Sequence, residues 1–527
     1  MRKKNLSALF STFPFKYLPT QLPDVAVTGI AIDSRAVSPG DLFVAMQGGS
    51  VDGHDYISMA IDKGAVAVVG QKDVGVLSVP YIRVDDPRHS LTYLAAAFYD
   101  WPGRKLTVIG VTGTDGKTTT CNLIYRILVA AGLKAGMIST VNAVIGDDVL
   151  DTGFHVTTPD AHDVQRYLAK MVEAGLTHVV LETTSHGWSQ HRVDACEFDI
   201  GVVTNITHEH LDEHGSYENY RAAKARLFSS LERTGSKPQG NPRLAVINRD
   251  DRSFDFLNEY IKVSKVTYGL GVEADVRAVD IMYDSQGMRF VVENPEFRVS
   301  IKVNLVGQYN VSNSLAALSA AVFGLGIDPE VAAQGISKLP GIPGRMEMID
   351  MGQDFLAVVD FAHTPNALKV TLETARQMTA GRVICVFGSA GLRDKEKRRM
   401  MAEIAAELAD LTVLTAEDPR TESLAGILDE MGAGAGSRGG REGETFWRIA
   451  DRGEALRFAL RLVRSGDILL ACGKGHEQSM CFGKVEHPWD DRVAMRAALA
   501  ELLGVDGPEM PYLPTQDTQE KEWLTWK

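Results

Sequence analysis

The chain has 527 residues, of which 45% are hydrophobic and 23% are charged, and its formal net charge is −13 at pH 7. This composition is typical of a globular protein and excludes a disordered or fibrous chain, while the length predicts roughly two to four domains. The negative charge argues against a broad nucleic-acid-binding surface.

The five cysteines are scattered without a pair at metal-ligand spacing, so we expect reduced thiols. The N-terminal apolar stretch is short and broken, and no long apolar run follows it, so we expect neither a signal peptide nor a membrane span. A cytoplasmic protein that binds neither nucleic acid nor membrane is the interpretation we favour.

Residues 1–102 alternate short apolar runs with turns, and WPGRK (101–105) predicts a linker because Pro and Gly end regular elements. Beyond it, β-branched runs alternate with helical segments, which is typical of a mostly parallel sheet. The predicted buried strands are LTVIGV (106–111), THVVLETTS (177–185), FDIGVVTNIT (198–207) and RLAVIN (243–248). Residues 272–305 alternate with a period of two and predict antiparallel hairpins.

The stretch LPGIPGR (339–345) resembles a hinge, and a second α/β region follows it. Its predicted strands are FLAVVDF (355–361), RVICVFGSAG (382–391), LTVLTAED (411–418) and DILLACGKG (467–475). The Gly-rich segment 432–444 predicts a mobile loop, and the polar, Pro-containing tail from 506 predicts a loose end. The fold class is therefore α/β with three domains, at 1–102, 103–339 and 340–505, and a tail at 506–527.

The segment GVTGTDGKTTT (110–120) is a Gly-rich turn between a predicted strand and a predicted helix. Such a turn directs backbone N–H groups and the positive end of the helix dipole toward phosphate. Lys117 would neutralise the β- and γ-oxygens of ATP, and the Thr118 hydroxyl would reach Mg²⁺. Val111 stands where the usual loop has its first Gly, so this is a variant loop. The alternative is a Gly-rich turn without a ligand; we favour nucleotide binding because small, phosphate-suited residues fill the turn.

Carboxylate and imidazole side chains follow two of the predicted strands. Glu182 ends one strand, where it could hold the Mg²⁺ that Thr118 contacts, because ligands collect at the carboxyl ends of parallel strands. After the next strand come His208, His210 and His214, and then a predicted helix that carries Lys224. Taken alone, such an acid, such a histidine cluster and such a lysine are more often structural or solvated.

A series of motifs in chain order resembles the Mur ligase superfamily, and within it most closely the UDP-MurNAc-tripeptide synthetase branch. The matching segments are DSRAVSPGDLFVAMQG (33–48), DGH (52–54), TGTDGKTT (112–119), TTP (157–159), SHGWSQHR (185–192), HLDEHG (210–215), LVGQYNVSN (305–313), PGRME (343–347), DFAHTPNAL (360–368), GLRDKEKR (391–398), EDPR (417–420) and GKGHE (473–477). The resemblance covers essentially the whole chain and explains the variant loop. It implies an N-terminal UDP-sugar-binding domain, a central P-loop ATPase-type domain with extra antiparallel strands, and a C-terminal Rossmann-like domain that binds an amino acid.

The resemblance also implies a reaction. ATP would phosphorylate the D-Glu side-chain carboxylate of UDP-MurNAc-L-Ala-D-Glu, and a diamino acid would attack the resulting acyl phosphate to form an amide. The implied catalytic residues are Lys117, Glu182, His210 and Lys224. Thr118 and Glu182 would hold one Mg²⁺, while His210 and Lys224, the latter as a carbamate, would hold a second.

The implied ligand contacts fall into two further sets. ATP would be bound by Gly113, Thr114, Asp115, Gly116, Lys117, Thr118, Thr119, Asn310, Arg345, Asp360 and His363. The UDP-sugar peptide would be bound by Ile32, Ser34, Gly49, Ser50, Val51, Thr157, Thr158, Thr184, Gln190 and Arg192. Thr184 replaces the usual Ser but keeps a hydroxyl, whereas Val156 replaces a common Asn and removes one polar contact.

The implied diamino-acid contacts are Arg393, Glu417, Asp418, Pro419, Arg420, Gly473 and Glu477, with Leu392 in place of a frequent Asp. In the family, DNPR accompanies meso-diaminopimelate, whose distal carboxylate pairs with the Arg. Here the motif is EDPR, so Arg420 favours meso-diaminopimelate while the acid Asp418 favours a basic acceptor. Meso-diaminopimelate, L-lysine and L-ornithine all stay open.

Three alternative functions have distinct requirements. Another ligase of the superfamily, of folylpolyglutamate or cyanophycin type, fits the first-domain motifs poorly. A P-loop phosphotransferase would turn over ATP without an amino acid, and a silent homologue should lack the four catalytic residues. We expect a monomeric ligase whose domains close by rotation about 339–345.

Overall fold

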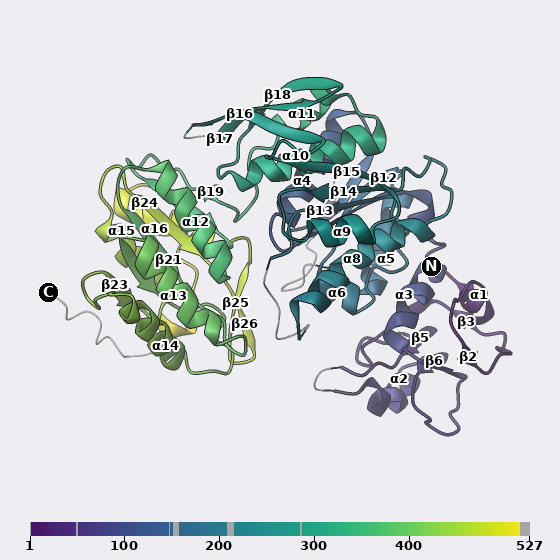
Figure 1. Ribbon diagram of the computed structural model, residues 1–527. Coiled ribbons are helices and arrows are strands. Elements are labelled where there is room, and N and C mark those ends of the chain that lie inside the picture. The colour runs from purple at the N-terminus through teal and green to yellow at the C-terminus, as the bar shows by residue number, and fades with distance from the viewer. Residues whose placement is uncertain are drawn as a thin grey trace. The chain divides into compact units, whose positions relative to one another are not determined.

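The computed structural model describes residues 2–48, 51–146, 148–150, 158–207, 215–284 and 287–516. The chain divides into two compact units (Figure 1). The first contains Met1–Val279, Val291–Ser300 and Ser312–Ile336, and the second contains Asp280–Phe290, Ile301–Val311 and Ser337–Lys527. The three predicted domain boundaries stay predictions.

The N-terminal part is built on a five-stranded sheet with the order β2-β7-β6-β5-β4, in which only the β2–β7 pair is antiparallel. Its strands are β2 (Tyr17–Leu18), β4 (Gly29–Ala31), β5 (Asp41–Val44), β6 (Ala67–Gly70) and β7 (Tyr81–Val84). Its helices are α1 (Leu6–Phe10), η1 (Gly53–Tyr56), α2 (Ile57–Asp62) and α3 (Pro87–Phe98), and β1 (Lys4–Asn5) pairs with β3 (Ala26–Val27).

The central sheet has the strand order β11-β10-β9-β12-β8-β13-β14-β15-β16-β17-β18. The pairs from β9 to β16 are parallel, which confirms the predicted parallel sheet. The strands are β8 (Thr107–Thr112), β9 (Ala135–Ile138), β10 (Ala143–Ile145), β11 (Asp148–Leu150), β12 (His178–Glu182), β13 (Ile200–Val203), β14 (Leu244–Asn248), β15 (Ser264–Gly269), β16 (Val276–Asp284), β17 (Gly287–Asn294) and β18 (Phe297–Val303).

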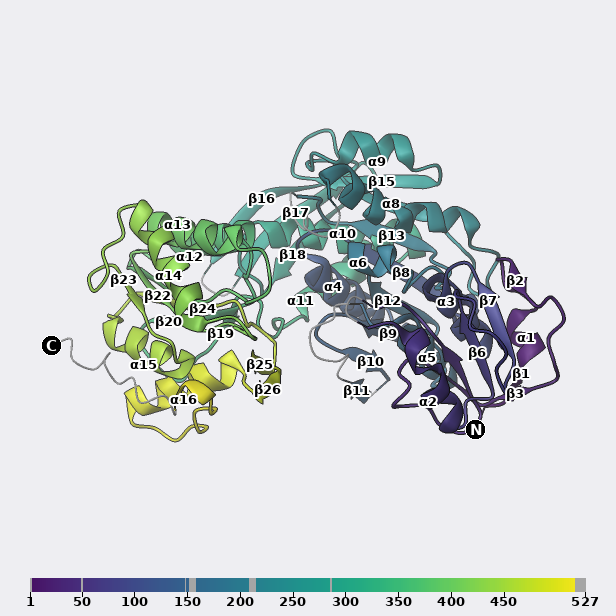
Figure 2. The same cartoon turned by 90° about the horizontal axis from the view of Figure 1, so that it is seen from below.

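Helices cover this sheet because the crossover between two parallel strands must return along a face of the sheet. They are α4 (Lys117–Ala130), α5 (Ala161–Glu173), α6 (Ser185–Ser189), α8 (Tyr217–Arg233), α9 (Phe254–Tyr260), α10 (Tyr309–Leu325) and α11 (Pro329–Ser337). Helix α5 also packs against α3, and Figure 2 shows the two side by side. In the described part of the chain, no helix is long and apolar enough to cross a membrane.

The segment 101–105, which the sequence predicts to be a linker, contains a short helical turn. Pro102–Lys105 form a short 3-10 helix, η2, in which Pro102 and Gly103 are buried. A Cβ atom at Gly103 would lie 2.3 Å from the Cys196 carbonyl oxygen. The Gly therefore serves close packing against the central part of the chain.

The second unit contains a six-stranded sheet with the order β19-β20-β24-β21-β22-β23, parallel except at β19. Its strands are β19 (Glu347–Met348), β20 (Leu356–Asp360), β21 (Val383–Phe387), β22 (Leu411–Leu414), β23 (Phe446–Arg448) and β24 (Ile468–Cys472), and β25 (Ser479–Phe482) and β26 (Val485–Pro488) form a hairpin. Two cores lie on its two faces, one beneath α12 (Pro365–Met378), α13 (Glu396–Leu408) and α14 (Leu424–Ser437), the other beneath α15 (Arg452–Leu462) and α16 (Asp491–Leu503). This is the expected Rossmann-like arrangement.

The prediction of a mobile loop at 432–444 was wrong for its first half, because helix α14 continues to Ser437. Its glycines allow α13 and α14 to pack closely: a Cβ atom at Gly434 would lie 2.8 Å from the Arg399 carbonyl oxygen and 3.2 Å from Ala402 Cβ. Composition indicated flexibility, whereas the glycines here provide space for a neighbouring helix.

The prediction of a loose tail from 506 was also wrong for residues 513–516. Leu513 is fully buried in a core of the second unit, and the Thr515 hydroxyl donates to Asp451 Oδ2 over 2.6 Å. Pro514–Gln516 form the 3-10 helix η3. Residues 517–527 lie outside the described part of the chain.

Two glycines of α14 provide a matched stability test. Gly434→Ala should destabilise the protein by about 1–3 kcal/mol, because the added methyl group overpacks the α13 contact. Gly436→Ala should instead stabilise it by about 0.5–1 kcal/mol, because Gly436 has open space around it and Ala is the better helix former. Denaturant unfolding measures both, and equal effects of the two substitutions would contradict the close-packing account.

Candidate nucleotide and substrate site

The Gly-rich loop follows β8 at the centre of the large sheet, and α4 begins at Lys117. Gly113 and Gly116 have φ angles of 150° and 79°. A Cβ atom would lie 1.8 Å from Thr204 Oγ1 at Gly113 and 2.3 Å from Asn313 Oδ1 at Gly116. Both positions therefore require Gly, which explains the variant spacing of the loop.

The loop is also anchored by the chain that leaves β13. Thr114 N–H donates to the Asn205 carbonyl oxygen over 2.8 Å, and Asp115 N–H donates to Asn205 Oδ1 over 3.0 Å. The sequence prediction did not include Thr204, Asn205 and Asn313 as site residues. Asn205 lies near the end of the predicted strand 198–207, so the strand-end argument that identified Glu182 could have found it.

Thr118 and Glu182 come together as predicted. Parallel pairing places Glu182 of β12 beside Val111 of β8. Thr118 Oγ1 lies 3.1 Å from Glu182 Oε1 and 3.0 Å from Oε2, and Thr140 N–H donates to Oε2 over 3.0 Å. Both side chains are buried. A hydroxyl and a carboxylate are hard oxygen donors of the kind that Mg²⁺ prefers, so the residues fit the expected ion.

Two lysines direct their ammonium groups at the loop itself. Lys117 Nζ donates to the Thr114 carbonyl oxygen over 2.7 Å, and Lys224 Nζ donates to the Gly113 carbonyl oxygen over 2.6 Å. Lys224 lies on α8 and is only 2% exposed. The solvated-lysine alternative for Lys224 is therefore wrong.

The residues predicted to bind the UDP-sugar peptide form a second polar group beside Glu182. Thr158 Oγ1 lies 3.3 Å from the Glu182 carbonyl oxygen and 3.2 Å from Thr184 Oγ1. Arg192 Nη1 donates to the Thr158 carbonyl oxygen over 2.6 Å, and Nη2 donates to Gln190 Oε1 over 2.7 Å. The hydroxyls of this group therefore adjoin the strand end that carries Glu182.

The N-terminal members of that set lie apart from this group. Ile32 and Ser34 follow β4, and Val51 is 52% exposed. A hollow of about 560 Å³ is lined by Met46, Gln47, Gly48, Gln71, Asp85, Asp86, Pro87 and Arg88. Val51 does not line it but follows Gly48 closely in the sequence. The predicted residues Gly49, Ser50, Thr157 and His210, together with His208 and His214, lie outside the described residues.

In the second unit, the predicted residues collect at the carboxyl ends of β20, β22 and β24. Asp360 Oδ2 accepts from Met346 N–H over 2.7 Å, and Oδ1 accepts from Ala362 N–H over 2.9 Å and from Thr371 Oγ1 over 3.0 Å. The Asp360 carboxylate thus connects the backbone just before β19, at Met346, to the backbone just after β20, at Ala362. Asn310 Nδ2 donates to the Val306 carbonyl oxygen over 2.7 Å.

Two further predicted nucleotide contacts surround Phe361. The Arg345 guanidinium lies 4.4 Å from the centre of the Phe361 ring. His363 Nδ1 lies 2.9 Å from the Phe361 carbonyl oxygen, and desolvation together with the charge of Lys397 lowers the pKa of His363 to about 3. His363 is therefore a neutral hydrogen-bonding group at pH 7.

The EDPR motif is held by a buried ion pair. Lys474 Nζ lies 3.1 Å from Asp418 Oδ1 and 2.6 Å from Glu477 Oε2, and Cys481 N–H donates to Asp418 Oδ1 over 2.9 Å. Lys474, absent from the predicted set, therefore compensates the charge of Asp418. By contrast, no hydrogen bond or ion pair within the described chain engages the side chains of Arg393 or Arg420.

Glu417 is buried at 6% exposure, and its Oε2 has no hydrogen-bond partner among the described residues. A Cβ atom at Gly473 would lie 2.4 Å from this oxygen, so Gly there opens the space in front of the carboxylate. Desolvation raises the pKa of Glu417 to about 7. A buried, unpaired carboxylate of this kind is suited to receive a ligand ammonium group.

This raised pKa predicts a pH dependence of stability. Between about pH 4.5 and pH 7 the folded state keeps a proton on Glu417 that the unfolded state releases, so stability falls as the pH rises through this window. Gln does not titrate, so the Glu417→Gln variant does not lose stability in this way. The difference in melting temperature, variant minus wild type, should therefore increase from pH 5 to pH 7 and then stay constant. Glu509→Gln, at an exposed position, is the control. A pH-independent difference for Glu417→Gln would contradict the buried, protonatable carboxylate.

Comparison with known proteins identifies the family of this chain. Models of the Mur ligase family catalytic domain, the Mur ligase middle domain and the Mur ligase glutamate ligase domain match residues 26–99, 111–321 and 344–475. A UDP-N-acetylmuramyl-tripeptide synthetase of Roseiflexus sp. is 44% identical over 494 residues, covering 92% of this chain and 96% of the relative.

Two further similarities extend over nearly the whole chain. A UDP-N-acetylmuramoyl-L-alanyl-D-glutamate–2,6-diaminopimelate ligase of Bacillus cereus is 39% identical, covering 93% of this chain and 97% of the relative. A solved structure of a ligase with that same name is 30% identical, with a TM-score of 0.65, covering 95% of this chain and 99% of the other. With the variant loop, the Thr118–Glu182 pair and these similarities together, the chain belongs to the Mur ligase family.

Proposed function

We propose that this chain is an ATP-dependent ligase that joins a diamino acid to the D-Glu side-chain carboxylate of UDP-MurNAc-L-Ala-D-Glu, a step of peptidoglycan precursor synthesis. The observation that carries the proposal is the position of Glu182. Its carboxylate contacts Thr118 of the phosphate loop, while its carbonyl oxygen contacts Thr158 of the predicted peptide-binding group. A phosphate site and a carboxylate-substrate site thus share one strand end.

A carboxylate does not react with an amine under mild conditions, because hydroxide or oxide is a poor leaving group. Transfer of the γ-phosphoryl group of ATP to a carboxylate oxygen releases ADP and gives an acyl phosphate, whose C–O bond to phosphate can break. The amine nitrogen attacks the acyl carbon, loses a proton, and the tetrahedral intermediate expels inorganic phosphate to leave an amide. Lys117, at the start of α4, would bind the transferred phosphate as negative charge accumulates on its oxygens.

Two Mg²⁺ ions are expected to neutralise the charge between the phosphate chain and the carboxylate. Thr118 and Glu182 would hold one ion, and His210 and Lys224 the other. Lys224 would act as an anionic ligand after reaction of its neutral amine with CO₂. Its burial beside Gly113 supports a role at the phosphate loop.

The remaining predicted ATP contacts fall into two groups, one in the phosphate loop and one in the second unit. The glycines and threonines of the loop, residues 113–119, would bind phosphate through backbone N–H groups and hydroxyls. In the second unit, Arg345 offers a guanidinium, and Asn310 and His363 offer neutral polar groups. Asp360 is better suited to positioning, because its carboxylate already accepts three hydrogen bonds.

The acceptor pocket contains groups for both ends of a diamino acid. Glu417 would receive an ammonium group. Arg393 and Arg420, whose guanidinium groups have no hydrogen-bond or ion-pair partner among the described residues, would bind carboxylates. Because the charge of Lys474 compensates that of Asp418, the acid in EDPR favours a basic diamino acid less strongly than the sequence alone implies. Meso-diaminopimelate, L-lysine and L-ornithine all fit this description. We further propose a cytoplasmic, monomeric enzyme.

Removal of the Thr118 hydroxyl tests the metal-binding pair. Thr118→Val keeps the shape of the side chain but removes the hydroxyl. We expect its affinity for Mg²⁺ to fall about 10- to 100-fold, the usual loss when a metal-site contact is removed. Thr118→Ser keeps the hydroxyl and should behave like wild type. The measurement is the Mg²⁺ concentration that gives half-maximal phosphate release. The same value in the Val and Ser variants would contradict the assigned role.

Acceptor dependence tests the function. Phosphate release from ATP should require UDP-MurNAc-L-Ala-D-Glu and one diamino acid, added singly from the three candidates. Phosphate release without any amino acid would contradict the ligase and favour a phosphotransferase.

Arg420→Ala tests the recognition of the diamino acid. If the best acceptor has a distal carboxylate, Arg420→Ala should reduce the kcat/KM for that acceptor by about 10-fold or more relative to the kcat/KM for L-lysine, as expected for loss of a charge-assisted pair. An unchanged acceptor preference would contradict carboxylate pairing by Arg420.

A further inference from the structure

His191 stands between Gln190 and Arg192, the two residues of the 188–194 segment that are proposed to bind the UDP-sugar peptide. Its φ angle of 56° lies in the left-handed region. A residue other than Gly keeps that conformation only where its surroundings hold it, and such residues often lie at ligand-binding sites. The contacts of His191 therefore determine where the side chains of its two neighbours point.

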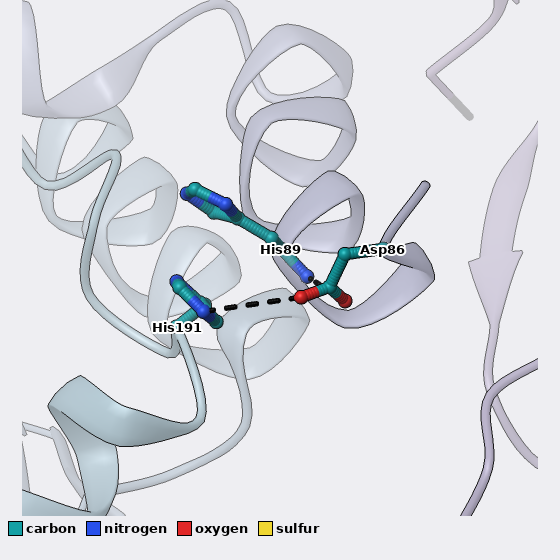
Figure 3. A group of neighbouring side chains, drawn as sticks. All are labelled: Asp86, His89 and His191. Carbon is teal, nitrogen blue, oxygen red and sulfur yellow. Dashed lines mark hydrogen bonds and ion pairs between the residues drawn. The ribbon is translucent and has the colours of Figure 1, made fainter. Parts of the chain in front are cut away.

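Helix α3 of the N-terminal part contacts the His191 ring (Figure 3). His89, in the first turn of α3, stacks on His191 with ring centroids 3.8 Å apart and planes inclined by 23°. Asp86, the N-cap of the same helix, lines the hollow of the N-terminal part, and its Oδ2 lies 3.9 Å from His191 Nε2. Stacking restricts the plane of the His191 ring but leaves rotation within that plane open.

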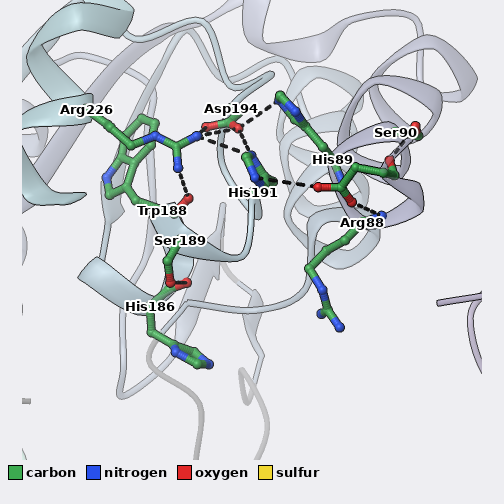
Figure 4. Close-up of polar contacts among 10 residues, drawn as sticks. Arg88, His89, Ser90, His186, Trp188, Ser189, His191, Asp194 and Arg226 are labelled. Carbon is green, nitrogen blue, oxygen red and sulfur yellow. Dashed lines mark hydrogen bonds and ion pairs between the residues drawn. The ribbon is translucent and has the colours of Figure 1, made fainter. Parts of the chain in front are cut away.

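Asp194 sets the direction of the ring within that plane. Its Oδ2 lies 2.5 Å from His191 Nδ1 and 3.1 Å from His89 Nε2, and its side chain is only 3% exposed (Figure 4). Arg226 of α8 also contacts this carboxylate, with Nη2 3.0 Å from Oδ1 and 2.9 Å from Oδ2. Desolvation alone would raise the pKa of Asp194, but the hydrogen bonds from the two histidines and the charge of Arg226 lower it. The carboxylate is therefore charged at pH 7 and accepts strongly from His191 Nδ1–H.

Arg226 joins the two ends of the 188–194 segment. Besides its contacts with Asp194, its Nη1 donates to the Trp188 carbonyl oxygen over 2.6 Å. Helix α8 also carries Lys224, whose ammonium group donates to the Gly113 carbonyl oxygen of the phosphate loop. One helix thus holds both the 188–194 segment and the phosphate loop.

We propose that His191 and Asp194 are positioning residues for the UDP-sugar peptide. Asp194 holds the left-handed backbone of His191, and this backbone directs the side chains of the two flanking residues toward the ligand. The inference rests on the proposed function, which assigns these flanking residues, Gln190 and Arg192, to that ligand.

Arg192 shows the direction that results. Its Nη1 donates to the Thr158 carbonyl oxygen over 2.6 Å, and its Nη2 donates to Gln190 Oε1 over 2.7 Å. A segment held in this way loses less conformational entropy on binding than a free loop, so its affinity for a ligand is higher. Loss of the Asp194 charge or of the left-handed backbone should therefore weaken binding of the UDP-sugar peptide.

The test is calorimetric titration of the full chain with UDP-MurNAc-L-Ala-D-Glu, in the presence of Mg²⁺ and a non-hydrolysable ATP analogue. Asp194→Asn keeps the shape of the side chain but removes its charge, and Asp163→Asn, at an exposed ion pair of α5, is the matched control. His191→Ala disfavours the left-handed backbone, whereas His191→Asn tolerates it and places an amide N–H near the position of Nδ1. This His191 pair decides the outcome on its own if Asp194→Asn does not fold. The affinity for the ATP analogue alone is measured with the same proteins.

We expect Asp194→Asn and His191→Ala to bind the UDP-sugar peptide about 10-fold more weakly than the parent protein, because a charge-assisted hydrogen bond or a favourable backbone conformation is lost. His191→Asn and Asp163→Asn should stay within about 3-fold of the parent, and all four variants should bind the ATP analogue within about 3-fold of the parent.

Parent-like binding of the UDP-sugar peptide by Asp194→Asn and His191→Ala would overturn the positioning role alone. Equal losses for the two ligands, or equal losses in His191→Ala and His191→Asn, would overturn it as well. No binding of the UDP-sugar peptide by the parent would overturn the proposed function and the positioning role together.

Discussion

Parallel pairing of β8 with β12 and β13 is the constraint on which the phosphate site depends. The register places Glu182 beside Val111 and Val203 beside Thr112, so three strands end at one edge of the sheet. The loop, the Glu182 carboxylate and the Thr204–Asn205 anchor are all supplied by those ends. Hydrogen bonds along buried strands fix this register, so the sheet itself holds these groups near one another.

Steric exclusion then shapes the loop. Thr204 and Asn313 fill the space that side chains at Gly113 and Gly116 would need, and the glycines adopt φ angles that favour them. Asn205, which is distant in sequence, also anchors the loop through hydrogen bonds from the N–H groups of Thr114 and Asp115. The same principle operates in the second unit, where Gly473 leaves room in front of Glu417.

The sequence predicted much of the fold because buried parallel strands are continuous β-branched runs, as at 106–111 and 467–475. It also predicted that Thr118 and Glu182 meet, since strand order places their ends together. Composition alone misled at 432–437, where Gly provides space for helix packing, and at 513–516, where Leu513 is buried in a core. The Asp418–Lys474 pair could not be predicted, because it joins the ends of separate strands through side chains whose directions no local pattern reveals.

If ATP activates the D-Glu carboxylate as an acyl phosphate, one oxygen of that carboxylate must leave with the phosphate. The measurement uses UDP-MurNAc-L-Ala-D-Glu with ¹⁸O in both oxygens of the D-Glu side-chain carboxylate, together with ATP, Mg²⁺ and the preferred diamino acid. Because the bridging oxygen of an acyl phosphate leaves with phosphorus, the account predicts one ¹⁸O atom in each released phosphate and the other in the amide product. Unlabelled phosphate formed together with product would contradict it.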